Sequence, residues 1–203
     1  MRNIRFAALV LLASIAAPAL GQTPGSPDPA KVEAGSYAVE PLHTQVLFAI
    51  SHLGFTTFYG AFTGASGTLS LSTTDPASST LEVSVPISGV STNNAKLDGE
   101  LKGDKFFNAA AYPAMTFKLT KLIVGGKDTA QAMGDLTMHG VTKPITLDVH
   151  FHGGGANPMS KKATIGFDVS GEIKRSEFGM TSYLPLLGDD VKLIISAAFE
   201  KQG

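Results

Sequence analysis

The stretch GDLTMHGVTKPITLDVHFH, from Gly134 to His152, decides the fold class of this chain. Apolar and polar residues alternate on both sides of His139–Gly140, which is typical of two antiparallel strands joined by a tight turn. In its second half, one face carries Ile145, Leu147, Val149 and Phe151, and the other carries Thr146, Asp148, His150 and His152. The pattern therefore predicts a sheet with one apolar face and one polar face.

The same alternation recurs along the chain, in TQVLFAIS, TLEVSVPIS, MTFKLTKL, TIGFDVS and VKLIISAAFE. These segments, with the two strands above, predict about eight antiparallel strands that share one apolar face. Many strands with short turns favour a closed all-β barrel. An eight-stranded barrel has an interior that is either just filled by side chains or able to hold one small ligand.

Two segments depart from simple alternation. In FYGAFTGASGTLSLS the apolar residues change parity between Phe62 and Leu69, so we expect a bulge or sharp bend at residues 64–67, where the glycines allow it. Residues 93–107, NNAKLDGELKGDKFF, predict a short helix weakened by two glycines, and a second helical turn is possible at residues 51–55.

The N-terminus predicts export. Arg2 and Arg5 precede an uncharged apolar run that ends in APALG, so residues 1–21 are expected to be a cleaved signal peptide, too short to anchor the chain in a membrane. Residues 22–35 are expected to be a flexible lead-in, and residues 36–201 a single barrel domain. The protein is therefore expected to be periplasmic or secreted, and without cysteine it has no disulfides.

The charge balance argues against nucleic acid or an anionic membrane surface as the main partner. Without residues 1–21 the chain keeps 14 Lys and Arg against 17 Asp and Glu, a formal charge of −3, and it contains no basic run. No later segment is apolar enough to insert stably in a membrane.

Enzyme and metal chemistry have weak signals. The chain contains no G-x-S-x-G, HExxH, GxGxxG or phosphate-binding glycine loop, so we expect no catalysis. His150 and His152 share one strand face and are the alternative: two ligands of a metal site whose other ligands the sequence does not supply. His139 is expected to be a surface residue of its turn.

Several motifs together resemble the YceI-like family of exported, lipocalin-like polyisoprenoid-binding proteins. They are YAVEPLHTQVLFAISHLGF, FYGAFTGASGTLSL, LKGDKFFNAAAYPAMTF, GDLTMHGVTKPITLDV and KRSEFGM, and they cover nearly the whole chain after the signal segment. The resemblance implies a lipocalin-like barrel with an internal hydrophobic tunnel, which binds a long-chain isoprenoid or a similar amphiphilic lipid and needs no other cofactor.

A tunnel of this kind needs apolar walls and a few polar groups at one end. The wall candidates have inward parity and are large or adaptable: Phe48, Ile50, Phe58, Phe62, Met115, Phe117, Met138, Phe167 and Phe199. The candidates for a polar mouth are His43, His52, Asp104, Tyr112 and Arg175. For Arg175 the alternative is a surface ion pair with Glu172 or Glu177.

The sequence leaves three hypotheses open. The first is a carrier of a hydrophobic small molecule, the second is a metal-dependent protein using His150 and His152, and the third is a stress-related barrel with a packed interior. A homodimer is possible in each case.

Overall fold

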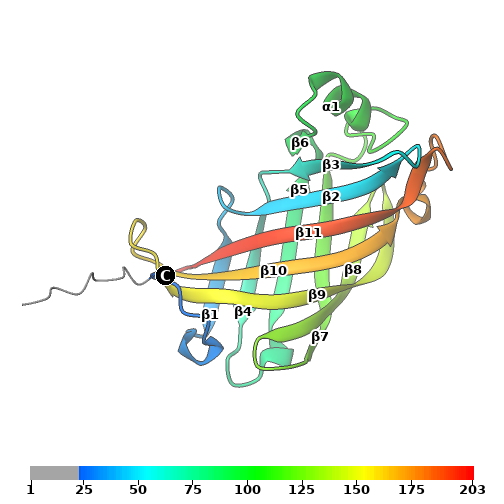
Figure 1. Ribbon diagram of the computed structural model, residues 1–203. Helices are drawn as coiled ribbons and strands as arrows, with labels where there is room; N and C mark the ends of the chain where they lie inside the picture. Colours follow the sequence, from blue (N-terminus) through cyan, green and yellow to red (C-terminus); the bar gives the residue numbers. More distant parts are fainter. Residues whose placement is uncertain (1–22) are drawn as a thin grey trace, which may run out of the picture.

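The computed structural model describes residues 23–203, and the predicted signal peptide lies outside this range. The chain forms an antiparallel barrel with one α-helix at one end (Figure 1). The strands are β1 (Gly35–Val39), β2 (Gln45–His52), β3 (Thr56–Phe62), β4 (Ser66–Leu71), β5 (Thr80–Pro86), β6 (Val90–Ser91), β7 (Ala114–Val124), β8 (Thr129–Met138), β9 (Val141–Ala156), β10 (Ala163–Lys174) and β11 (Leu187–Lys201). The helical elements are α1 (Ala95–Lys102) and the 3₁₀ turns η1 (Pro29–Lys31), η2 (Pro76–Ser78), η3 (Ile87–Gly89) and η4 (Arg175–Phe178).

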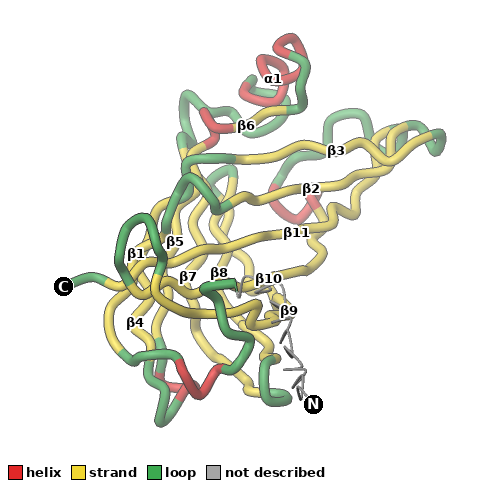
Figure 2. The backbone as a smooth tube through the Cα atoms, turned by 60° about the vertical axis from the view of Figure 1, so that its left-hand side comes forward, coloured by secondary structure: helices red, strands yellow, loops and turns green. Residues whose placement is uncertain are grey.

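The eleven segments make eight strands of a barrel, as the alternation predicts. Neighbouring strands follow the order β1-β4-β5-β7-β8-β9-β10-β11, and β1 pairs with β11 to close the ring. Towards the end that carries α1, β11 also pairs with β2, β2 pairs with β3, and β3 pairs with β6. Thus β1 and β2, β3 and β4, and β5 and β6 are halves of three interrupted strands, whereas β7 to β11 run without a break (Figure 2).

The predicted change of parity is confirmed at the break between β3 and β4. Gly64 and Gly67 have φ angles of 78° and 155°, which side chains rarely allow. A β-carbon on Gly67 would also collide with the carbonyl of Glu82 on β5. The break lets Phe62 and Leu69 both turn into the core despite their opposite parity.

Helix α1 confirms the single helix predicted within residues 93–107. Asn94 caps it, because its side chain accepts hydrogen bonds from the main-chain N–H groups of Lys96 and Leu97 at 3.1 and 3.3 Å. The helix ends at Gly103. The possible second helical turn is wrong: residues 53–55 form the β2–β3 hairpin turn, in which Leu53 and Gly54 have left-handed φ of 54° and 70°.

The described part of the predicted lead-in contacts the barrel. Ser26 and Gly154 exchange two main-chain hydrogen bonds of 2.9 Å, and Val32 packs against the core cluster. The hydroxyl of Tyr37 donates to the carbonyl of Glu33 at 2.7 Å. These contacts lay the segment along the edge of β9 beyond its pairing with β8, and bring Pro29, Ala30 and Val32 to the cavity.

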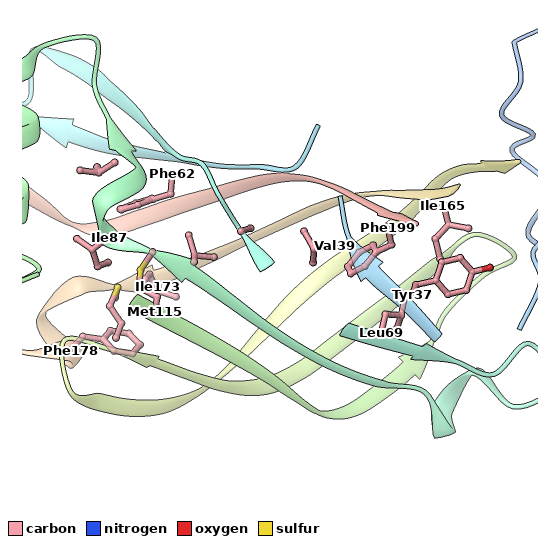
Figure 3. Packing of buried hydrophobic residues seen from close by; sticks show 14 of the residues in the cluster. Tyr37, Val39, Phe62, Leu69, Ile87, Met115, Ile165, Ile173, Phe178 and Phe199 are labelled. Carbon is pink, nitrogen blue, oxygen red and sulfur yellow. The ribbon is translucent and has the colours of Figure 1, made fainter. Parts of the chain in front are cut away.

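Buried apolar side chains gather towards the two ends of the barrel (Figure 3). Phe62, Ile87 and Phe178 lie near the end that carries α1, and Tyr37 and Ile165 lie near the opposite end. Between them, inward-facing residues such as Phe48, Phe117, Leu136, Phe167 and Leu193 are only partly buried. They remain accessible because they face an internal space.

A candidate ligand cavity inside the barrel

The internal space is a cavity of about 810 Å³ along the barrel axis. Strand β9 shows how the sequence builds its wall. Ile145, Leu147, Val149 and Phe151 line the cavity, and the residues between them point outward. Alternate side chains of a strand face opposite sides of the sheet, so each strand of the barrel contributes every second residue to the wall.

All nine residues predicted as walls line the cavity: Phe48, Ile50, Phe58, Phe62, Met115, Phe117, Met138, Phe167 and Phe199. The aromatic and sulfur-containing residues are not the whole wall, however. Many aliphatic residues on the same faces line it too, among them Leu81, Val83, Leu119, Leu136 and Leu193. The period-two pattern alone identifies these aliphatic residues. They are absent from the predicted wall because it included only aromatic, sulfur-containing or otherwise large side chains among those of inward parity.

Two glycines, each on the strand next to that of a phenylalanine, set the positions of the Phe48 and Phe117 rings. Gly60 pairs with Phe48 across β2 and β3, and a β-carbon on Gly60 would collide with that ring. Gly134 on β8 lies under the ring of Phe117 in the same way. Both rings therefore lie over the sheet instead of filling the centre, which keeps the cavity open.

Arg175 lines the cavity, but its guanidinium group is hydrogen-bonded to main-chain carbonyls of the protein itself. Its side chain is only 4% exposed. Nε donates to the carbonyl of Gly188 at 2.8 Å, Nη1 donates to Met180 and Ser182 at 2.7 and 2.9 Å, and Nη2 donates to Leu187 at 3.1 Å. Burial lowers the pKa of this guanidinium, and the Asp189 carboxylate acts in the opposite direction. The side chain thus holds the β10–β11 connection in place, and neither Glu172 nor Glu177 pairs with it.

The other candidates for a polar mouth are dispersed. His52 lines the cavity at the α1 end, and its ring lies 6.4 Å from that of Phe58. His43 lies outside the cavity, where its exposed ring contacts Glu40 at 2.7 Å. Asp104 is exposed outside the cavity, and Tyr112 packs edge-on against His139. The alternation gives a signal for His52, which continues the inward series of Phe48 and Ile50 on β2.

His139 is less exposed than a surface turn residue would be. It occupies the β8–β9 turn with φ of 52°, and its Nδ1 lies 2.9 Å from the carbonyl oxygen of Phe178. The contact joins the β8–β9 turn to η4. The residues of η4 are therefore fixed from two sides, by His139 and by Arg175.

His150 and His152 point outward, as the alternation predicts. His152 Nδ1 lies 2.8 Å from the carboxylate of Asp168, and His150 Nε2 lies 3.4 Å from that of Asp128. Within residues 23–203, no group of three His, Cys, Asp or Glu side chains is placed to hold a metal ion. The two histidines form part of a solvent-exposed polar network on the outer face.

The closed fold and the apolar cavity define the class of lipocalin-like barrels with an internal binding space. This chain belongs to the YceI-like family, since the sequence model of the YceI-like domain matches residues 37–199. Protein YceI of Escherichia coli is 38% identical over 157 residues, which are 77% of this chain and 81% of that protein. The resemblance inferred from the motifs is confirmed.

Solved structures give the same fold. The YceI protein of Campylobacter jejuni is 31% identical, with a TM-score of 0.65 over 76% of this chain and 91% of its own. A polyisoprenoid-binding domain from Saccharophagus degradans, implicated in plant cell wall breakdown, is 14% identical, with a TM-score of 0.59 over 84% of this chain and 100% of its own. At that identity the second likeness concerns the fold.

No helix among residues 23–203 combines the length and the apolar character needed to cross a bilayer.

Proposed function

We propose that this protein is a periplasmic carrier that holds a long isoprenoid or a similar amphiphilic chain inside the barrel. The observation that carries the proposal is the apolar cavity of about 810 Å³. Apolar walls with few polar groups bind a ligand through burial of its hydrocarbon surface, at about 25 cal/mol per Å². Such a site suits a chain that is too insoluble to cross water alone.

The family and the signal sequence support the same function. The chain shares its fold with a domain described as polyisoprenoid-binding, and residues 1–21 carry the pattern of an export signal. An exported carrier without catalysis fits this combination. The cargo class, the location outside the cytoplasm and the absence of catalysis are parts of the proposal.

The cavity limits the length of the cargo. If a methylene group takes a space similar to that of a water molecule, ~30 Å³, the cavity holds roughly 25 carbon atoms. An isoprenoid of about five units would fill it. A longer chain would extend through one end of the barrel.

The other two hypotheses are less well supported. A barrel with a packed interior does not account for inward-facing Phe48, Phe117 and Phe167 remaining partly accessible. A metal-dependent function would rely on His150 and His152, which face away from the cavity and have two aspartates as their neighbours.

Native mass spectrometry of the protein purified without an affinity tag tests the proposal. We expect a co-purifying mass that organic extraction releases as an isoprenoid or fatty chain. Emptied protein should then bind prenyl alcohols with an affinity that rises about fourfold per added methylene, until the chain outgrows the cavity near roughly 25 carbons. A bare mass that no prenyl alcohol changes would refute the carrier function.

A further inference from the structure

Two loop tips lie together at the α1 end of the barrel and expose apolar side chains. They are the β2–β3 hairpin and the β10–β11 connection (Figure 1). The N–H of Leu53 in the hairpin donates to the carbonyl of Leu186 in the connection at 2.8 Å. Phe55 is 85% exposed, and Tyr183 and Leu186 are 55% and 59% exposed. Large apolar side chains gathered at a surface mark an interaction site.

Residues 51–57 and 179–188 of these tips carry no ionisable side chain other than His52 and Tyr183; Arg175 and Glu177 of the β10–β11 connection lie before them, in η4. Residues 51–57 read SHLGFTT and residues 179–188 read GMTSYLPLLG. The turns at the opposite end of the barrel all carry charge, in STTDPASS, GGKD and NPMSKK. The barrel is therefore polarised along its axis, with an uncharged apolar edge at one end only.

The apolar edge is continuous with the cavity. Leu53, Tyr183 and Leu186 are exposed to solvent and also line the cavity, and the ring of Phe106 stacks on that of Tyr183 at 6.1 Å. Arg175 holds the carbonyls of Ser182 and Leu187, so the edge is built rigidly. An apolar path thus leads from the surface to the binding space.

We propose that this edge docks on the surface of a lipid bilayer and takes up the cargo there. The inference rests on the proposed carrier function, because an insoluble chain has to come from a membrane. Phe55 and Leu186 would enter the boundary between headgroups and acyl chains, and Tyr183 suits it because its ring is apolar and its hydroxyl is polar.

The charge around the edge favours neutral lipid. Helix α1 and the residues after it balance three bases against three acids: Lys96, Lys102 and Lys105 with Asp98, Glu100 and Asp104. No basic cluster is present there to attract anionic headgroups. Docking is therefore expected on vesicles of phosphatidylcholine alone, with little dependence on salt.

The absence of tryptophan from the chain provides a direct test. In Phe55→Trp a single indole reports on the hairpin tip. Met159→Trp is the matched control, because Met159 is 88% exposed in the turn at the opposite end. Phosphatidylcholine vesicles should shift the emission of the first variant to the blue and leave the second unchanged. No shift at position 55, or equal shifts at both positions, would overturn the docking.

A second variant connects docking to uptake. Phe55→Ser should reduce partitioning onto these vesicles about tenfold, because a largely exposed phenyl group is lost. Extraction of a prenyl alcohol from the vesicles should slow to match. Phe55 does not line the cavity, so binding of the same alcohol from an ethanol stock should stay unchanged. Extraction at the wild-type rate would contradict the docking.

The two proposals fail in different ways. If the wild type binds the alcohol from ethanol but does not float with vesicles, docking is wrong and the carrier function stands. If it floats through Phe55 but binds no prenyl chain by either route, the carrier function is wrong.

Discussion

Replacing Arg175 with methionine tests whether this side chain is a structural support or a ligand for a charged head group. Methionine keeps an unbranched stem of similar length but removes the four hydrogen bonds to main-chain carbonyls. A hydrogen bond from a charged donor is worth about 1.5–3 kcal/mol, so four give an upper value near 6–12 kcal/mol. These carbonyls lie close to the barrel mouth, where water can replace part of the loss. We expect a decrease in the free energy of unfolding of about 3–4 kcal/mol.

In a domain of this size, each kcal/mol changes Tm by about 2–4 °C, so the expected decrease is roughly 10 °C. Circular dichroism of the sheet during heating measures it on protein freed of lipid. Arg175→Lys should recover little, because an ammonium group cannot match the planar fork of a guanidinium. A Tm within about 2 °C of the wild type, with selective loss of affinity for anionic over neutral amphiphiles, would show that Arg175 serves a head group and that the structural interpretation is wrong.

Three further outcomes are expected. Phe117→Asp places a carboxylate in the cavity wall and should lower the retention of a prenyl chain in native mass spectra, while circular dichroism still shows a folded barrel. Gly134→Ala puts a methyl group under the Phe117 ring and 2.6 Å from the carbonyl oxygen of Lys118, so urea denaturation should show a loss of about 1–3 kcal/mol. Hydrogen bonds from Ser176 hold the pKa of Asp189 below its ordinary value of 3.8, so its contribution to stability is complete above that pH and is lost as the pH falls further. Asp189→Asn should therefore reduce the difference between urea midpoints at pH 7 and pH 3.

Alternation of apolar residues was enough to predict the barrel and its wall. Ile145, Leu147 and Val149 face inward because a strand side chain has only two directions to choose from. The parity change before Leu69 located the break between β3 and β4 for the same reason. Both inferences need only the order of apolar and polar residues along a single strand, which the sequence states directly.

The polar residues could not be placed in this way. Arg175 was a candidate for a head group because it follows an apolar strand. Its partners are main-chain carbonyls in residues 180–188. Every residue has such a carbonyl, so the sequence does not indicate which ones accept hydrogen bonds from a side chain. His52 is the exception, since it has the inward parity of Phe48 and Ile50 on β2, whereas His43 lies before that strand and outside the cavity. The position of His43 depends on how the interrupted strand bends between β1 and β2, where alternation gives no direction.

The three interrupted strands are neighbours, so their breaks, at residues 40–44, 63–65 and 87–89, form one belt of sparse main-chain pairing on one side of the barrel. Across it, Thr63 N–H donates to the Gly89 carbonyl at 3.1 Å, and the hydroxyl of Thr44 stands in for the main chain in bonding Ala198. Few ladder hydrogen bonds cross this belt, whereas β7 to β11 are continuous. Local opening costs least where main-chain pairing is sparse. Within the barrel wall, amide protons at residues 40–44, 63–65 and 87–89 should exchange with deuterium before those of β7 to β11. The barrel should widen on that side to admit a bulkier chain, while the opposite wall keeps its shape.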